Sequence, residues 1–458
     1  MNTILCNYGY VINKSIVSNN LDKIKKDLNV EPFSINNNFY NNNKFKVYSE
    51  NNKQICVPRY YGLKHFGDPE INDIYEGDDI DIKFNGKLRD YQEKILNIFI
   101  PKLKENKGGL LCIPPGKGKT VLAIYLLSLL KKKTLIIVHK TFLVNQWKKR
   151  LEQYVPDAKV GIIQQNKIEV DGYDIVIGML HSLVLKDYEH EIFEDFGFSI
   201  IDEVHHLGAE TFSKVFKKTN TNYVCGLTAT PNREDKLEKI IYWHIGNILY
   251  LEKAEINQKI NVNLCQFNCD DELFIEVINK KTKTAQMATM ITNISNIEKR
   301  TITIINFVLQ IKKKEPLRKI LILSERLEHL DEMKKLIEKT YFTVSKYIGG
   351  MSEKNLEKSE EAEIILSTYQ MSSEGLDIPT LNTIVLSTSR KNVEQSVGRI
   401  LRKQSGHAVT PLIIDIIDNI KQFKNQSSIR KRYYKKITDE NNFKKFKNLN
   451  DNFELISM

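Results

Sequence analysis

Short apolar runs alternate with longer amphipathic stretches along the chain from Gly86 onward. Such alternation is typical of a mostly parallel β-sheet flanked by helices. A helix is predicted at 142–154, because Trp147, Leu151 and Tyr154 recur at helical spacing while Lys and Arg occupy the other face. A first group of strands is expected at 109–114, 134–138, 174–178, 198–202 and 223–229.

The same alternation returns in the C-terminal half of the chain. Strands are expected there at 319–324, 363–368, 383–388 and 411–417. The predicted fold class is α/β, with two tandem parallel-sheet domains at 85–250 and 316–424. Residues 1–84 are assigned to an N-terminal accessory domain and residues 425–458 to a basic tail. Residues 251–315 fit neither pattern, and we expect a linker or a small helical insertion between the two lobes.

Length and composition exclude several classes of protein. The 458 residues, of which 41% are hydrophobic and 27% charged, are ordinary for a folded chain, so a small stapled module, a fibre and a disordered chain are excluded. The longest nearly apolar run, 121–130, is far shorter than the ~20 residues that cross a bilayer, so no membrane span is expected. The N-terminus lacks the layout of a secretory signal, and we expect an intracellular protein.

The charge balance points to a polyanionic partner. The formal net charge is +11, which favours nucleic acid ahead of an acidic membrane surface. In the tail, aromatic residues are interleaved with Lys and Arg, so it either grips phosphates and stacks on bases or is a solvated end without a function. The six cysteines are expected to be reduced thiols, the alternative being half of a metal site at Cys265 and Cys269.

The segment IPPGKGKT, residues 113–120, follows a predicted buried strand and opens an apolar helix. This is the context that a phosphate-binding loop requires, with glycines that let backbone N–H groups turn toward phosphate oxygens. Lys119 is expected to reach the β and γ phosphates, and the Thr120 hydroxyl to ligate Mg²⁺. The alternative is a turn that is merely rich in Lys and Gly. The nucleotide-binding candidates in this loop are Pro115, Gly116, Lys117, Gly118, Lys119 and Thr120.

The segment SIIDEVHH, residues 199–206, places two adjacent carboxylates at the C-terminal end of another strand, where open α/β sheets collect their ligands. Asp202 is expected to hold Mg²⁺ and Glu203 to orient and deprotonate the attacking water. His205 is a candidate relay of the nucleotide state to the other domain. The alternative reading is a transition-metal site that contains Asp202, His205 and His206.

In the second domain, a loop that contains Gly and Asp follows a predicted strand at 367–379, and a helix is predicted at 393–403. Arg399 and Arg402 are three residues apart, so they share one face of that helix. Two guanidinium groups on one face suit a γ-phosphate approached from across a cleft. A surface salt bridge is the alternative for such a pair. The further site candidates are Gly375, Asp377 and Gln395.

Taken together, these motifs resemble those of superfamily 2 helicases of the DEXH type, over residues 86–415. In order along the chain they read LRDYQ, GKGKT, DEVH, TAT, SSEGLD and QSVGRILR. The continuation TATPNRED is similar to the XPB and UvsW branch, and ICVPRYYG and YIGGMSE are similar to helicases of large nucleocytoplasmic DNA viruses, including the poxvirus transcript-release type.

The resemblance implies two RecA-like domains that bind ATP and Mg²⁺ between them. It implies that Gln92, with Arg89 beside it, contacts adenine, and that Arg399 and Arg402 complete the catalytic site. It also implies 3′ to 5′ movement on DNA, and a location in the cytoplasm, including a viral factory or the virion, or in the nucleus. We expect a monomer, with transcription or replication machinery as partner.

Three functions stay open at this point. The first is a DNA helicase or translocase in transcription, replication or recombination. The second is an RNA-directed ATPase that releases transcripts or remodels ribonucleoprotein, for which the same motifs serve. The third is a P-loop scaffold without turnover, against which the presence of Glu203 and Arg399 argues.

Overall fold

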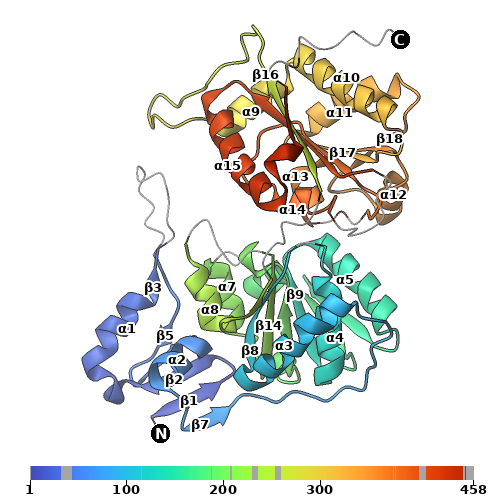
Figure 1. Cartoon of the computed structure of the whole chain (residues 1–458). Coiled ribbons are helices and arrows are strands. Elements are labelled where there is room, and N and C mark those ends of the chain that lie inside the picture. The colour runs from blue at the N-terminus through green and yellow to red at the C-terminus, as the bar shows by residue number, and fades with distance from the viewer. Residues whose placement is uncertain are drawn as a thin grey trace. The chain divides into compact units, whose positions relative to one another are not determined.

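The structure is a computed structural model that describes residues 2–31, 44–114, 116–186, 188–206, 209–229, 236–252, 259–374, 376, 378–401, 409–446 and 449. The chain divides into two compact units, Met1–Lys253 and Ala254–Met458, and each is described by itself (Figure 1). In the described residues, no helix has both the length and the apolar character that a membrane crossing requires.

The first unit begins with a five-stranded sheet in the order β5-β6-β2-β1-β7. Its neighbouring strands are antiparallel except for β1 and β7. The strands are β1 (Thr3–Cys6), β2 (Gly9–Asn13), β5 (Ser49–Glu50), β6 (Gln54–Val57) and β7 (Ile71–Asp73). The chain between and after these strands forms α1 (Leu21–Asp27), the short pair β3 (Asn29–Val30) and β4 (Phe45–Lys46), and α2 (Arg59–Phe66).

Helix α2 fastens this N-terminal sheet to the α/β part of the same unit. The ring of Tyr61 meets the edge of Trp243, on α8 (Glu238–Ile245), with ring centroids 5.4 Å apart. The buried Arg59 guanidinium donates to the backbone carbonyls of Thr221 and Asn222 at 3.0 and 3.1 Å. One hydrophobic cluster runs through both parts, so the N-terminal region and the first α/β sheet form one compact unit.

The main sheet of the first unit has eight strands in the order β11-β10-β12-β9-β13-β14-β8-β15. All neighbours are parallel except β10 and β11, as the buried apolar runs predict. The strands are β8 (Gly108–Cys112), β9 (Thr134–Val138), β10 (Val160–Gln164), β11 (Lys167–Ile168), β12 (Ile175–Met179), β13 (Phe198–Ile201), β14 (Tyr223–Thr228) and β15 (Ile248–Leu251).

Helices cover both faces of this sheet and bury a core on each side. One core packs under α3 (Asp90–Asn106), α4 (Lys119–Leu130) and α5 (Thr141–Tyr154). The opposite core lies under α6 (Leu180–Leu185), α7 (Ala209–Phe216), α8 and the N-terminal sheet. The predicted helix at 142–154 is confirmed as α5, and the five predicted strands match β8, β9, β12, β13 and β14 to within about two residues.

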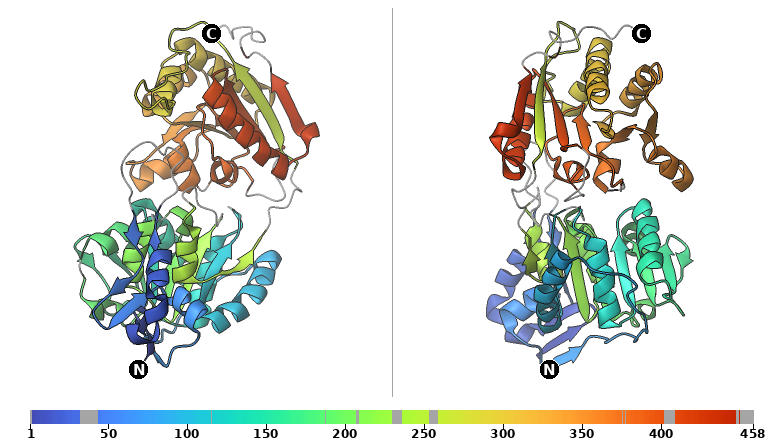
Figure 2. Two further views of the ribbon diagram at one scale, coloured as in Figure 1. Left: turned by 90° about the vertical axis from the view of Figure 1, so that its left-hand side faces the viewer. Right: turned by 45° about the vertical axis from the view of Figure 1, so that its right-hand side comes forward.

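The second unit contains a seven-stranded, wholly parallel sheet in the order β18-β19-β17-β20-β21-β16-β22. Helix α15 covers one face, and α10 and α11 cover the other (Figure 2). The strands are β16 (Asn261–Phe267), β17 (Ile320–Ser324), β18 (Val344–Tyr347), β19 (Ile364–Thr368), β20 (Thr383–Leu386), β21 (Leu412–Asp418) and β22 (Phe443–Phe446). The helices are α9 (Met287–Ser295), α10 (Glu298–Lys314), α11 (Leu327–Glu338), α12 (Glu353–Ser359), α13 (Tyr369–Glu374), α14 (Glu394–Val397) and α15 (Lys421–Ile437).

The segment 251–315 differs from the expected linker or insertion. Its strand β16 pairs with β21 over seven residues and buries Val262, Leu264 and Phe267 in the core. Helix α10 likewise buries one face against the sheet. The polar residues Asn261, Asn263 and Gln266 interrupt the apolar run, and for this reason the sequence pattern missed the strand.

The basic tail also differs from a solvated end over residues 421–446. Helix α15 buries Phe423 and Tyr434, and β22 pairs with β16 at the sheet edge. The buried Arg430 makes a bidentate ion pair with the buried Asp415 of β21, at 2.9 and 2.8 Å. One positive charge of this segment, that of Arg430, is therefore buried in the fold, whereas many of its lysines are exposed.

Candidate nucleotide-binding site

The loop between β8 and α4 has the backbone that its glycines predict. Gly116 and Gly118 both have φ of +82°, in the left-handed region that other residues avoid. A Cβ atom on Gly118 would also lie 2.5 Å from Nε2 of Gln92, so a larger residue would displace the Gln92 amide. Helix α4 begins at Lys119, directly after the loop. Pro115 lies outside the described residues.

Gln92 is buried at the start of α3 and holds the loop through its amide group. Its Oε1 accepts from the backbone N–H of Arg89 at 3.0 Å, and its Nε2 donates to the carbonyl of Lys117 at 3.2 Å. The hydroxyl of Tyr91 donates to the same carbonyl at 3.3 Å. The segment predicted to contact adenine is thus bonded to the phosphate-loop candidate.

The side chain of Lys117 is held by two residues that the sequence analysis did not identify. Its ammonium lies 3.3 Å from Oε1 of Glu252 and 4.9 Å from the centroid of the Tyr91 ring. Glu252 follows β15, far from the loop in sequence, so no local pattern predicts the contact. Lys119, two residues along the chain, is the lysine that faces the carboxylates after β13.

Lys119, at the start of α4, and Glu203, after β13, form an ion pair. Nζ of Lys119 lies 2.9 Å from Oε1 of Glu203, and the two side chains are only 12% and 19% exposed. Glu203 has φ of +45°, an uncommon backbone conformation that clusters at functional sites. Nδ1 of His205 lies 3.4 Å from the second Glu203 oxygen and 2.8 Å from Oγ1 of Thr228, at the end of β14. The structure therefore brings together residues from three predicted motifs.

Asp202 lies beside this pair and is almost fully buried. Its Oδ2 accepts from the indole N–H of Trp147 at 2.9 Å, and its Oδ1 accepts from the backbone N–H of Glu203 at 3.0 Å. Burial, and secondarily the neighbouring charge of Glu203, raises the pKa of Asp202 to about 6. Trp147 was predicted on the apolar face of the helix at 142–154 and as the last residue of a nucleic-acid-contacting segment, 139–147. It is 1% exposed, and the sequence did not reveal its bond to Asp202.

Of the two predicted metal-binding residues, Asp202 directly follows β13 and Thr120 lies in the first turn of α4. Within the described parts of the chain, no group of three or more His, Cys, Asp or Glu residues is arranged to hold a metal. The alternative transition-metal site at Asp202, His205 and His206 therefore gains no support, although the His206 side chain is not among the described ones.

In the second unit, Arg399 is buried and bonded to the predicted nucleotide-binding loop. Its Nε donates to the carbonyl of Ser372 at 2.7 Å, and the Ser372 hydroxyl donates to that of Ser396 at 2.8 Å. Gln395 lies half-buried on α14. Gly375, Asp377 and Arg402 lie outside the described residues.

The predicted helix at 393–403 is shorter than expected. Helix α14 ends at Val397, and Arg399 lies in the following turn, where backbone N–H groups bond three residues back. This tighter turn agrees with the side-chain bonds that tie Ser396 and Arg399 to Ser372. Because Arg402 lies outside the described residues, the shared face of Arg399 and Arg402 stays a prediction.

The loop that leads from β20 to α14 is held by three buried donors. Arg300 donates to the carbonyl of Ser387 at 2.5 Å, and Arg430 donates to that of Arg390 at 2.7 Å. The Tyr369 hydroxyl donates to the carbonyl between them, that of Thr388. Both arginines are paired with buried aspartates, Arg300 with Asp418 and Arg430 with Asp415.

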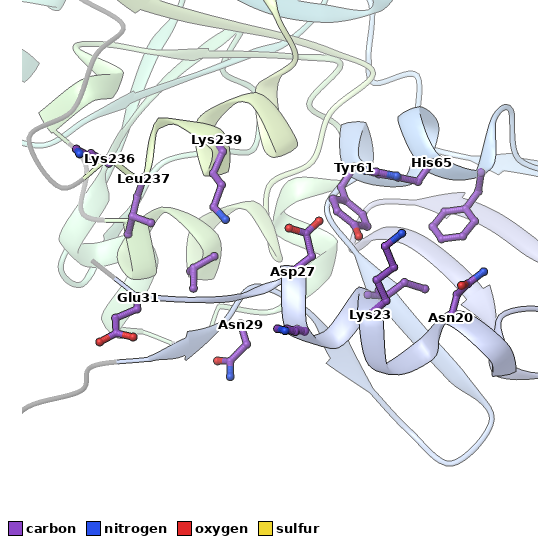
Figure 3. A pocket seen from close by; sticks show the side chains of 14 residues that line it. Asn20, Lys23, Asp27, Asn29, Glu31, Tyr61, His65, Lys236, Leu237 and Lys239 are labelled. Atoms are coloured by element: carbon purple, nitrogen blue, oxygen red, sulfur yellow. The ribbon is translucent and has the colours of Figure 1, made fainter. Parts of the chain in front are cut away.

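A pocket of about 760 Å³ lies elsewhere in the first unit, between α1, α2 and the start of α8. Lys23, Lys236 and Lys239 line it together with Asp27 and Glu31 (Figure 3). None of the predicted catalytic or nucleotide-binding residues lines it, so it is separate from the site described above.

Comparison with known proteins gives consistent matches. Residues 85–233 match the family described as type III restriction enzyme, res subunit, and residues 299–404 match the helicase conserved C-terminal domain. A protein of Acanthamoeba polyphaga mimivirus, named as an ATP-dependent RNA helicase, is 39% identical over 95% of this chain and 85% of its own length.

Two further relatives come from a virus and from an archaeon. A protein of African swine fever virus with the same kind of name is 28% identical over 76% of this chain and 73% of its own length. The DNA 3′-5′ translocase XPB2 of Sulfurisphaera tokodaii is 34% identical over a shorter region, 38% of each chain.

Proposed function

Because the chain belongs to the superfamily 2 helicases of large DNA viruses and is an ATP hydrolase with two tandem RecA-like domains, we propose that it uses ATP to move along DNA in the 3′ to 5′ direction. The direction and the choice of DNA follow the archaeal relative, which is named as a DNA 3′-5′ translocase. RNA is the second candidate, because both viral relatives are named as RNA helicases.

One observation carries the catalytic part of the proposal. The partly buried ion pair of Lys119 and Glu203, with Asp202 beside it, joins residues that follow the C-terminal ends of β8 and β13, which flank β14 in one sheet. Parallel sheets bind their ligands at this end. Lys119 supplies the charge for the β and γ phosphates, and Glu203 has a carboxylate oxygen with which to orient and deprotonate the attacking water.

The residues present fit a Mg²⁺ ion. Mg²⁺ prefers hard oxygen ligands and is usually bound by one or two carboxylates together with substrate phosphates. The buried carboxylate of Asp202 and the hydroxyl of Thr120, in the first turn of α4, are hard oxygen donors of this kind. Asp202 and Thr120 would hold the ion, which when bound neutralises phosphate charge.

The second unit supplies the other half of the proposed site. Arg399 and Arg402 would stabilise the charge that develops on the transferred phosphate, and Gln395, Gly375 and Asp377 would line the nucleotide. Arg399 is supported by its fixed position, since its bond to Ser372 joins two of the predicted motifs. Closing and opening of the two domains around ATP would then move the chain along the strand.

Contacts to the nucleic acid are proposed for three segments, 139–147, 178–183 and 372–377, the first of which includes the start of α5. Contacts to phosphate and sugar carry little sequence information, so weak sequence preference is expected. We also propose an intracellular monomer, in the cytoplasm, a viral factory, the virion or the nucleus, with transcription or replication machinery as partner. The six free cysteines agree with a reducing compartment.

The test is ATP turnover with DNA and RNA strands of equal length and sequence, followed by strand displacement from duplexes that carry a 3′ or a 5′ overhang. The proposal predicts stronger stimulation by DNA and displacement from the 3′ overhang. Stronger stimulation by RNA would favour the second candidate. Turnover that neither strand stimulates would contradict the motor function and favour a scaffold.

A further inference from the structure

The Asp202 carboxylate is bonded to a side chain that belongs to none of the nucleotide-binding motifs. Trp147 donates its indole N–H to Oδ2 of Asp202 at 2.9 Å, and the two residues are only 1% and 7% exposed. The other oxygen, Oδ1, accepts from the backbone N–H of Glu203 at 3.0 Å. Each carboxylate oxygen therefore has one fixed donor, and the orientation of the carboxylate plane is set from both sides.

Trp147 is itself fixed by the core of the first unit. On α5, the neighbouring Leu143, Val144 and Leu151 are buried in the same cluster as the indole ring. Strand β9, which precedes α5, is paired with β13, which precedes Asp202. The indole thus reaches Asp202 from a rigid element next to the strand that carries it, 55 residues away in sequence.

We propose that Trp147 is the positioning residue of the Mg²⁺ site, which aims the Asp202 carboxylate at the ion that accompanies ATP. The inference rests on the proposed function, because it assigns a role within the same site. An indole N–H is a neutral donor that cannot release its proton or compete as a charge, so it orients the carboxylate and leaves its negative charge for the metal. Groups that orient a metal ligand in this way typically contribute 10–100-fold to metal affinity or activity.

The position of Trp147 on α5 adds a connection to nucleic acid. Helix α5 begins at Thr141, inside the segment 139–147 that is proposed to contact the strand. Trp147 lies less than two turns further along the same helix. One rigid element would therefore contact the strand at its beginning and the metal-binding carboxylate through Trp147.

The chain contains only two tryptophans, Trp147 and Trp243, which makes a direct optical test available. The variant Trp243→Phe leaves Trp147 as the sole indole, and Trp243 packs on Tyr61 in another part of the unit. We expect the emission of Trp147 to change when Mg²⁺ is added to this variant with ADP bound. The matched variant Trp147→Phe, which keeps Trp243, should show no such change. A Trp147 emission that does not respond to Mg²⁺ would overturn the inference.

A second measurement uses the Mg²⁺ dependence of ATP turnover. The variant Trp147→Phe keeps an aromatic ring in the core and removes the N–H donor. The Mg²⁺ concentration for half-maximal turnover should rise about 10-fold, while turnover at saturating Mg²⁺ recovers to within about 2-fold. A merely structural role would instead lower the melting temperature and the maximal rate with unchanged Mg²⁺ dependence, and that result would refute the positioning role.

The two proposals fail in different ways. Absence of ATP turnover in the unaltered protein, with either nucleic acid, contradicts the proposed function itself. The emission measurement requires only bound nucleotide and Mg²⁺, so it tests the role of Trp147 even in a protein without ATP turnover. Normal turnover together with identical Mg²⁺ dependence in Trp147→Phe and the unaltered protein contradicts the role of Trp147 alone.

Discussion

The two α/β units hold their functional side chains by different means. In the first unit the site residues are bonded to one another, Lys119 to Glu203 and Asp202 to the backbone of Glu203. In the second unit Arg399 is bonded to the backbone of Ser372, and two buried arginines that are not predicted site residues, Arg300 and Arg430, hold the loop before α14. The second unit therefore has buried charged residues that support its proposed site without belonging to it.

This difference separates two kinds of mutational effect. In the first unit, loss of one charge changes the electrostatics of the site while the apolar cores on both faces of the sheet remain intact. In the second unit, loss of Arg300 or Arg430 leaves a buried aspartate without its ion-pair partner. Such a change should lower the free energy of unfolding more than it changes the rate of ATP hydrolysis.

The change with the greatest predicted consequence is in the framework of the second unit, by which we mean the buried ion pairs Arg300–Asp418 and Arg430–Asp415. Arg430→Met removes the partner of the fully buried Asp415 and should lower the free energy of unfolding of this unit by about 3–5 kcal/mol in denaturant titration. The matched control is Lys335→Met, which breaks an exposed pair with Glu332 and should leave the free energy of unfolding nearly unchanged. Equal costs for the two variants would contradict the assignment of Arg430 to the framework.

The next effect is on ATP turnover in the first unit. Lys119→Ala should lower kcat/KM for ATP about 100- to 1,000-fold, because it removes the ammonium group, now paired with Glu203, that is proposed to contact the β and γ phosphates. The melting temperature should change by only a few degrees. Full turnover in this variant would show that the loop does not bind the reacting phosphates.

Arg399→Ala should act on hydrolysis more than on ATP binding, since the proposed role of its guanidinium is to stabilise the charge that develops in the transition state. We expect kcat to fall about 100-fold while the Kd of ATP changes by less than about 3-fold. A circular dichroism melt controls for the loss of the bond to Ser372. Equal losses in binding and turnover would contradict this role.

The smallest effect concerns pH. The pKa of Asp202 in the folded protein, about 6, lies above its ordinary value near 4, so the folded state binds the proton more tightly than the unfolded state. The free energy of unfolding should therefore fall as pH rises from about 4 to about 6, and level off above that range. In EDTA, Asp202→Asn should remove this part of the pH dependence, on the order of 1–3 kcal/mol. An unchanged pH profile would show that Asp202 is not the group responsible.

Some elements of the structure were predicted accurately from the sequence, and others were not. The strand at 134–138 was predicted to the residue because it is a fully buried run of apolar and β-branched residues. The phosphate loop was predicted because its glycine spacing reflects a backbone requirement, seen at Gly116 and Gly118. Both features depend on residues that are neighbours along the chain, and such features can be recognised in the sequence alone.

The remaining features depend on contacts between distant residues. Strand β16 was missed because polar residues interrupt it, and its place in the sheet comes from pairing with β21. Arg430 was counted as part of a basic tail, although burial against Asp415 decides its role. The bond from Trp147 to Asp202 spans 55 residues, and no pattern along the chain encodes it.

Under the proposed function, side chains from both units act on one ATP molecule. The most direct measurement is a double-mutant cycle in single-turnover ATP hydrolysis, with Glu203→Gln from the first unit and Arg399→Ala from the second. Residues that act on the same transition state are strongly non-additive, so the double variant should lose far less than the product of the two single losses. A loss in the double variant equal to that product would contradict the shared site.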